Sequence, residues 1–162
     1  MTLPTYTKAK KIRMKNNPTF TEKWLQDLIA EDPSTLGLGD IELIDRERIQ
    51  HKAGRLDLLL SDPDSNTRYE VELMLGSTDE SHIIRTIEYW DIERRRYPGY
   101  DHVAVIVAED ITSRFLNVLS LFSGSIPFIA LQMSAVQIEN SISIVFSKVI
   151  DSTDLRTDDE SE

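Results

Sequence analysis

Three acidic side chains sit among apolar residues in one stretch of the sequence, residues 54–76. Asp57 interrupts a run of leucines, and Glu70 and Glu72 alternate with apolar residues farther along. A buried carboxylate is costly unless it is paired with a cation or bound to a metal, so acids at such positions need a reason. Carboxylates that converge at a sheet edge bind hard cations such as Mg²⁺ or Mn²⁺. The stretch therefore predicts a divalent-cation site.

The same stretch is typical of a β-hairpin. A turn signal over Ser61–Thr67 contains Asp62-Pro63-Asp64-Ser65-Asn66 and separates two strand-like halves. The second half alternates with period two, so Glu70, Glu72 and Met74 point to the face opposite the apolar residues. A hairpin would bring this acidic face close to Asp57.

The elements around the hairpin predict an α/β fold. Apolar spacing predicts helices over residues 19–32, 77–97 and 112–122, and strands around 41–49, 103–108, 126–131 and 142–146. The second helix is expected to start within Ser77-Thr78-Asp79-Glu80. The first helix begins with Thr19 and Glu22 at the spacing of a capping box, which is an alternative role for Glu22. On the second helix we expect Ile83, Ile84, Ile87 and Trp90 to form the buried stripe, with His82, Arg85 and Tyr89 on another face. The predicted architecture is a mixed sheet between helices.

Composition limits the class of protein. The chain has 162 residues, 40% hydrophobic content and no cysteine, which fits one domain in a reducing cytoplasm and excludes disulfides and thiolate metal sites. No apolar run approaches the roughly 20 residues that cross a bilayer. No apolar segment follows the first basic residues, so they do not form a signal peptide. Glycine-rich phosphate loops and the GxSxG and HExxH motifs are absent from the sequence.

Charge divides the chain into three parts. The net charge is −10, but basic residues gather at 8–15, 46–55 and 94–96, and acids gather near the end. We expect residues 1–18 to form a flexible basic arm, 19–150 the folded domain, and 151–162 a disordered acidic tail. The run 94–96 is explained by the dipole of a helix end, with phosphate contact as the alternative. His51 and His102 are expected to be structural, and Glu70 to be an exposed partner for an arginine.

The order of elements and motifs resembles the PD-(D/E)xK nuclease-like superfamily. The resemblance rests on a helix bearing Glu22, the strand GRLDLLL, the segment VELMLG and a long helix with Arg85 and Tyr89, and it covers about residues 20–108. It implies a restriction-endonuclease-like fold that cleaves DNA with Mg²⁺ or Mn²⁺. In that superfamily Asp57 and Glu72 would bind the metal, and Glu22, Arg85 and Tyr89 would complete the catalytic group. A shifted alignment would use Glu70 and Glu72 instead.

The resemblance fails at one position. Met74 stands two residues after Glu72, where the superfamily carries a lysine. A thioether has no charge, so it cannot replace an ammonium group. Arg85 is the best substitute, with Lys52 and His82 as weaker candidates. Arginine cannot act as a base near neutral pH, but it can stabilise charge on a phosphate.

Two functions follow from this pattern. The first is metal-dependent hydrolysis of DNA, with Lys52, Arg55, His82 and Arg85 as the expected substrate contacts. The second is a catalytically silent module that uses the same cleft to bind nucleic acid or a protein partner, and an interaction domain without a catalytic cleft is a further alternative. A homodimer is compatible with each, and a membrane is not an expected partner.

Overall fold

The computed structural model describes residues 2–153, and in them one mixed sheet contains seven strands. The order across the sheet is β1-β6-β5-β4-β3-β2. β5 and β1 pair with successive parts of one edge of β6, and β7 pairs with its opposite edge. The strands are β1 (Lys10–Ile12), β2 (Glu42–Gln50), β3 (Gly54–Asp62), β4 (Thr67–Ser77), β5 (Asp101–Asp110), β6 (Phe128–Ile138) and β7 (Ser141–Asp151).

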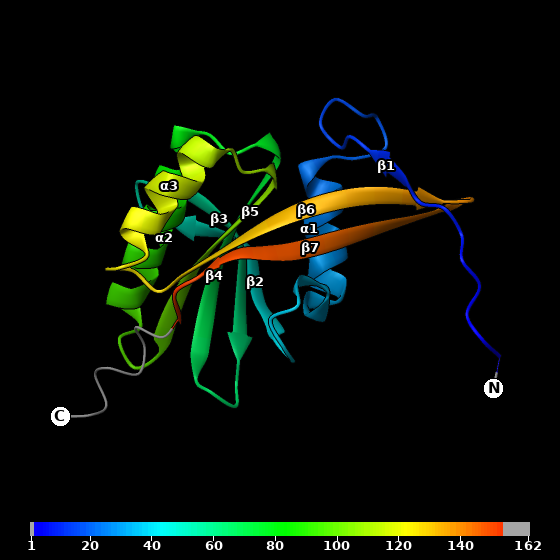
Figure 1. Cartoon of the computed structure of the whole chain (residues 1–162). Helices are drawn as coiled ribbons and strands as arrows, with labels where there is room; N and C mark the ends of the chain where they lie inside the picture. Colours follow the sequence, from blue (N-terminus) through cyan, green and yellow to red (C-terminus); the bar gives the residue numbers. More distant parts are fainter. Residues whose placement is uncertain (1, 154–162) are drawn as a thin grey trace.

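Helices cover both faces of the sheet. They are α1 (Glu22–Glu31), α2 (Glu80–Arg96) and α3 (Ser113–Phe122), with a short 3₁₀ helix, η1 (Pro33–Leu36). Figure 1 shows α1 on one side of the sheet and α2 and α3 on the other. One core packs Leu25 and Ile29 of α1 against apolar residues of the sheet, and a second packs Ile83 of α2 and Leu119 of α3 against the opposite face. The mixed sheet between helices confirms the predicted fold class.

The β3–β4 hairpin has the predicted alternation. The strands are antiparallel, with Leu58 opposite Val71 and Leu60 opposite Tyr69. Val71 and Tyr69 belong to the core under α1, and Glu70 and Glu72 extend from the other face. β4, β5 and β6 are parallel neighbours, so α2 and α3 serve as the crossovers between them. The hairpin thus presents its acids on the α2 side of the sheet.

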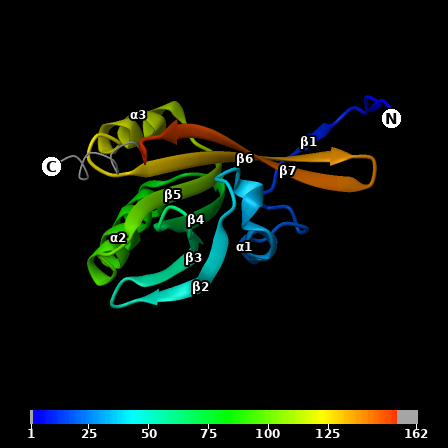
Figure 2. The same ribbon diagram turned by 90° about the horizontal axis from the view of Figure 1, so that it is seen from below.

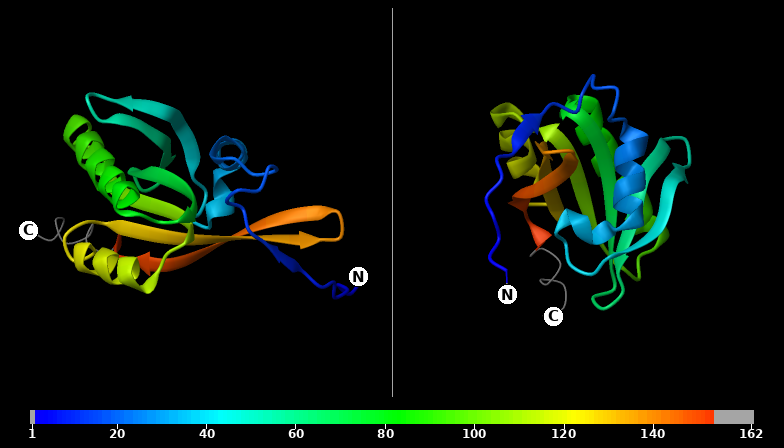
Figure 3. Two further views of the ribbon diagram at one scale, coloured as in Figure 1. Left: turned by 90° about the horizontal axis from the view of Figure 1, so that it is seen from above. Right: turned by 90° about the vertical axis from the view of Figure 1, so that its right-hand side faces the viewer.

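The end of the chain forms one long hairpin. The sequence predicts a strand that ends near residue 131, but β6 runs without a break from Phe128 to Ile138 and pairs along its length with β7. A turn at Glu139 and Asn140 joins them, and Glu139 adopts a positive φ of 55°. Figure 2 and the left view of Figure 3 show this hairpin extending beyond the helices. The far half of β6 therefore has an edge with which another strand of the chain can pair.

The prediction of a flexible arm over residues 1–18 is wrong at its centre. Strand β1 pairs with the far half of β6, with Lys10 opposite Gln137, and Met14 is fully buried in the core. The cause is the length of β6, which continues past the end of β5 and leaves an edge that β1 can fill. In the predicted tail, Asp151 ends β7 and residues 154–162 lie outside the described part of the chain.

No helix among residues 2–153 is long and apolar enough to cross a membrane.

Candidate functional site

Asp57 and Glu72 lie against each other across the β3–β4 hairpin. The backbone N–H of Asp57 donates a hydrogen bond to Glu72 Oε1 at 3.1 Å. The backbone N–H of Leu73 donates one to Asp57 Oδ2 at 2.8 Å. Each carboxylate is thus held by the backbone of the opposite strand, and the structure brings together the two acids that the sequence pattern singled out.

Burial weakens both carboxylic acids, and repulsion by a neighbouring charge adds to the effect. Glu72 is 2% exposed, and Asp57 is partly buried. Burial raises the pKa of both side chains above the ordinary range, and the negative charge of Asp57 raises the pKa of Glu72 further. A cation placed between them would offset this penalty, because it would stabilise both ionised forms.

Arg85 is the cation that the structure places beside this pair. Its Nε lies 3.5 Å from Glu72 Oε2, and its Nη1 donates a hydrogen bond to Ser81 Oγ at 2.9 Å. The side chain of Arg85 is 37% exposed, so its guanidinium reaches solvent as well as the carboxylate. Among the described residues no lysine forms an ion pair with Asp57 or Glu72.

Glu22 contributes charge to the site from α1. The predicted capping box is wrong, because the N-cap of α1 is Thr21, whose side chain accepts a hydrogen bond from the backbone N–H of Trp24. Thr19 is two residues too early for that role, so Glu22 is left without a capping function. Its exposed carboxylate lies near enough to Asp57 to help raise the pKa of that residue.

Gln26 is a site residue that the sequence analysis missed. It is 5% exposed, and its Nε2 donates to the carbonyl oxygen of Asp57 at 3.1 Å. Its Oε1 accepts a hydrogen bond from Arg46 at 3.3 Å. The available signal was a lone amide one position from Leu25, on the apolar stripe of α1. Gln26 fixes the backbone of Asp57 to the helix that carries Glu22.

His82 and Tyr89 do not lie on a face of α2 separate from its buried side, which was the expectation from the sequence. Both are buried, at 0% and 1% exposure, and Ile84 of the predicted buried stripe is 61% exposed. His82 Nε2 lies 3.2 Å from the carbonyl oxygen of Glu72, and burial lowers the pKa of His82 to about 4. The Tyr89 hydroxyl donates to the carbonyl oxygen of Ala53 at 2.8 Å. The stripe is rotated because these two polar groups find backbone partners. The assignment of His82 as a substrate contact stays a prediction, and the ring has no exposed surface in this structure.

Lys52 and Arg55 flank the hairpin at its start. Lys52 lies in the turn after β2 with a φ of 62°, and Arg55 is the second residue of β3. Both side chains are exposed. Their assignment as substrate contacts stays a prediction.

Glu70 is part of a separate buried group, not an exposed partner of an arginine. It is 0% exposed, and its Oε1 lies 2.5 Å from Nδ1 of His102, which is itself buried. Burial raises the pKa of Glu70 to about 7. Glu93 is also fully buried and accepts hydrogen bonds from Arg48 and Gln50, both at 2.8 Å. Because Glu70 is paired with His102, the geometry favours Glu72 over Glu70 as the partner of Asp57.

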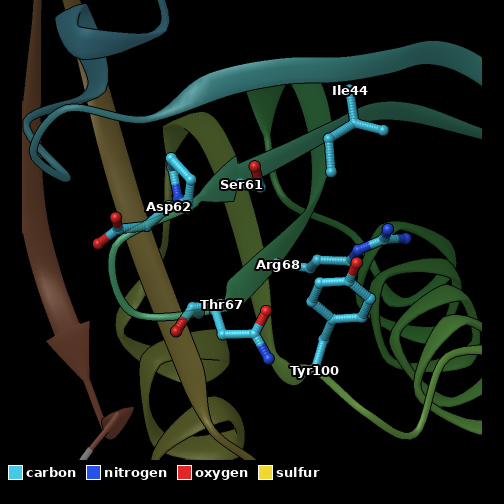
Figure 4. A pocket seen from close by; sticks show the side chains of 8 residues that line it. Ile44, Ser61, Asp62, Thr67, Arg68 and Tyr100 are labelled. Carbon is cyan, nitrogen blue, oxygen red and sulfur yellow. The ribbon is translucent and has the colours of Figure 1, made fainter.

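A small pocket borders this buried group at the turn of the hairpin. Figure 4 shows Arg68 beside the ring of Tyr100, with Ser61, Asp62 and Thr67 around them. The Arg68 guanidinium lies 4.1 Å from the centre of the Tyr100 ring and 4.6 Å from that of Tyr97. The pocket holds about 240 Å³, and neither Asp57 nor Glu72 lines it. It is therefore distinct from the carboxylate pair.

Met74 occupies the position at which the PD-(D/E)xK nuclease-like superfamily carries a lysine. It is partly buried on β4, opposite Ala108 of β5 and two residues after Glu72. Among residues 2–153 no three His, Asp or Glu side chains are grouped closely enough to hold a metal ion. Asp57 and Glu72 thus supply two oxygen-donor side chains, and further ligands would have to be backbone oxygens or water.

Comparison with solved structures shows a nuclease-like fold. The chain is similar to a repair endonuclease from Pyrococcus abyssi, with 25% identity over 62% of this chain and 43% of that chain, and a TM-score of 0.54. It is also similar to EndoMS in a complex with double-stranded DNA, with 24% identity over 69% of this chain and 44% of that chain, and a TM-score of 0.56. The chain spans less than half the length of these two proteins. No family model and no curated protein matches its sequence.

Proposed function

We propose that the protein is a divalent-metal-dependent endonuclease that acts on DNA. The observation that carries this proposal is the pairing of Asp57 and Glu72, which are two buried carboxylates held against each other by reciprocal backbone hydrogen bonds. Two adjacent buried carboxylates lower the stability of the fold unless a cation compensates their charge, so their position indicates a functional role such as metal binding. Perturbed carboxyl groups of this kind are typical of functional sites.

The donor set fits a hard cation. Carboxylate oxygens are the ligands that Mg²⁺ prefers, and Mg²⁺ commonly takes only one or two of them and keeps several waters. Asp57 and Glu72 would hold the ion, and Glu22 would act through water from α1. The ion would supply a Lewis acid that activates water and neutralises charge on the scissile phosphate. Leu73 and Asp57 backbone N–H groups would keep the two carboxylates in place throughout.

Arg85 would take the electrostatic role left open by Met74. Its guanidinium contacts Glu72 at 3.5 Å and is partly exposed, so it can reach a phosphate bound beside the pair. It would stabilise the charge that develops on the phosphate, and it would not accept a proton. Tyr89 would act only as a positioning residue, because its hydroxyl is bonded to the backbone of Ala53.

The structural neighbours support the substrate class. One is described as a repair endonuclease and the other was solved with double-stranded DNA. Since the chain covers less than half of each, DNA cleavage by this chain is our inference from the shared fold together with the carboxylate pair.

A second candidate is a binding module without activity. Two observations favour it: Met74 replaces the expected lysine, and Arg85 already lies against Glu72, where it compensates part of the charge that a metal would compensate. Such a module would bind DNA beside the same carboxylate pair without cleaving it.

Nicking of supercoiled plasmid separates the two functions. The wild-type protein with Mg²⁺ or Mn²⁺ should nick the plasmid, and EDTA should stop the reaction. Asp57→Asn and Glu72→Gln should each abolish nicking, because each removes an anionic oxygen donor. The matched control is Glu88→Gln, which neutralises an exposed carboxylate on α2 and should nick like wild type.

Metal-dependent nicking that survives both Asp57→Asn and Glu72→Gln would exclude this site. A wild-type protein that binds DNA and does not nick it would identify the silent module.

A further inference from the structure

A groove beside the protruding hairpin has a charge opposite to that of the whole protein. We call it the basic groove. It is lined by β1, by residues that follow β1 and by the β6–β7 hairpin, and it has a volume of about 540 Å³. Figure 3 shows the backbone of β1 beside that hairpin. The lining residues of the basic groove are Lys10, Lys11, Ile12, Arg13, Asn17, Thr19, Phe20, Gln137 and Ile142.

The lining is cationic in an acidic protein. The chain carries a net charge of −10, yet the described residues that line the basic groove include three cations and no acid. Lys10 and Lys11 are exposed and form no ion pair with any residue of the range 2–153. Arg13 is paired with Asp110 at 2.8 Å. Exposed lysines without acidic partners retain their charge for an external anion.

A buried carboxylate fixes the basic segment in place. Glu109 is 6% exposed and accepts hydrogen bonds from the backbone N–H groups of Met14, at 2.5 Å, and Lys15, at 3.1 Å. It also accepts one from the backbone N–H of Gly76, at 3.0 Å. Glu109 therefore ties the segment that follows β1 to the end of β4, the strand that carries Glu72.

Gly76 shows how closely the two segments approach. A Cβ atom added there would lie 2.4 Å from Cδ of Lys15, so the lysine side chain passes over the glycine. Gly76 also has a φ of 79°, which a residue with a side chain rarely adopts. Farther along, the same segment leads through Thr19 and Phe20 of the groove to Glu22, whose charge acts on Asp57. Residues 15–22 thus connect the basic groove to the carboxylate pair, because Lys15 packs on the end of β4 and Glu22 lies near Asp57.

We propose that the basic groove binds the phosphate backbone of duplex DNA beside the point of cleavage. Residues 10–13 span three steps of extended chain, or about 10 Å, which is longer than one phosphate group. Lys10 and Lys11 extend to opposite sides of β1, so the cations flank this length of chain and do not form one row. Cations spread over that length suit a polyanion, and side chains such as Asn17, Thr19 and Gln137 can donate hydrogen bonds to phosphate oxygens. This inference rests on the proposed function, because it assumes that DNA is the substrate.

The test measures binding without cleavage. A fluorescein-labelled 20-base-pair duplex is titrated in EDTA over a range of salt concentrations, with all variants in the Asp57→Asn background. The double variant Lys10→Gln/Lys11→Gln should bind more weakly, and its slope of log K against log salt should be smaller by about 1.8, since each phosphate contact contributes about 0.9. The matched control is Arg94→Gln/Arg95→Gln, which removes the same charge from the end of α2 and should bind like its parent.

The outcomes separate this inference from the proposed function. Equal affinity and slope for Lys10→Gln/Lys11→Gln and its parent would overturn the inference, and so would a larger loss in Arg94→Gln/Arg95→Gln. Because the assay needs no metal and no cleavage, a wild-type protein that never nicks plasmid would sink the endonuclease and leave the binding result standing. A protein that nicks plasmid while its binding is insensitive to Lys10 and Lys11 would sink the groove alone.

Discussion

The backbone N–H of Asp57 donates a hydrogen bond to the carboxylate of Glu72 at 3.1 Å, across the two strands of the hairpin. The carboxylate of Asp57 in turn accepts from the backbone of Leu73. These bonds hold the two acids together, and no lysine among residues 2–153 forms an ion pair with either. The negative charge of Asp57 therefore raises the pKa of Glu72. The predictions below follow from this relationship and from the segments that support it.

The stability of the metal-free protein should fall as pH rises. Burial raises the pKa of Asp57 and Glu72 in the folded state above the ordinary values near 4, so the folded state binds more protons than the unfolded state. The contribution is fully present below the ordinary pKa and is lost as pH rises through the raised values. Urea unfolding in EDTA at several pH values would measure this loss, at about 1.4 kcal/mol per unit of pKa shift.

Glu72→Gln isolates the contribution of the pair from those of other buried groups. Glu70 and His102 also have raised pKa values and lose stability in the same direction, whereas His82, whose pKa is lowered, gains stability as pH rises. The variant should show a smaller decline with pH than wild type. A decline of equal size in both proteins would contradict the assignment of the pair.

Arg85→Ala should be the most damaging substitution outside the two acids. Removal of one well-placed electrostatic group typically lowers the rate on the order of 10²–10³-fold. The measurement is single-turnover nicking at saturating protein, which separates the rate from DNA affinity. An unchanged rate would show that Arg85 has no part in the reaction.

Met74→Lys provides the complementary test. Met74 follows Glu72 by two residues and so lies on the same face of β4, where a new ammonium would stand near the carboxylates. It should restore nicking when combined with Arg85→Ala and change little in the wild-type protein. Failure of this rescue in a folded double variant would argue against a shared electrostatic role.

Gln26→Leu should destabilise the fold at the site. It removes the hydrogen bond to the carbonyl oxygen of Asp57, which is partly buried, at a cost of about 1 kcal/mol. Gln137→Leu is the matched control, because Gln137 also donates to a backbone carbonyl but does so at an exposed position. Equal decreases in the free energy of unfolding of the two variants, measured in urea, would show that the hydrogen bond of Gln26 stabilises the fold no more than that of Gln137.

Glu109→Gln should weaken DNA binding although it makes the protein less negative. Simple electrostatics predicts tighter binding when an acid is neutralised. Loss of the Glu109 charge, however, weakens three hydrogen bonds that fix Met14, Lys15 and Gly76. The duplex titration described above measures the difference. Tighter binding by this variant would show that the position of the basic segment does not matter.

The sequence was sufficient for the central hairpin and for the pairing of its acids. An acid within a leucine run and period-two alternation are local patterns, and both depend on the geometry of a single hairpin. The long helix after Gly76 was likewise predictable, with its start placed within residues 77–80 and its end one residue from the observed end. These features need no information on distant contacts.

The residues whose positions were predicted wrongly owe those positions to contacts between distant segments. His82 is buried because its ring meets the carbonyl oxygen of Glu72, and Met14 is buried because β1 fills an edge that only the length of β6 creates. Thr21 replaced Thr19 as the cap through a shift of two residues, which lies within the ordinary uncertainty of helix ends. Polarity alone suggested exposure for Glu70 and a position away from the buried stripe for His82, and in both cases a buried partner reverses the expectation.

Calorimetric titration with Mn²⁺ tests most directly whether Asp57 and Glu72 form a metal site. Wild type and Glu88→Gln should bind one ion in the hairpin site with equal affinity, more tightly at higher pH because the carboxyls must ionise. Asp57→Asn and Glu72→Gln should each lose this binding. Equal Mn²⁺ binding by wild type and Asp57→Asn would contradict the account.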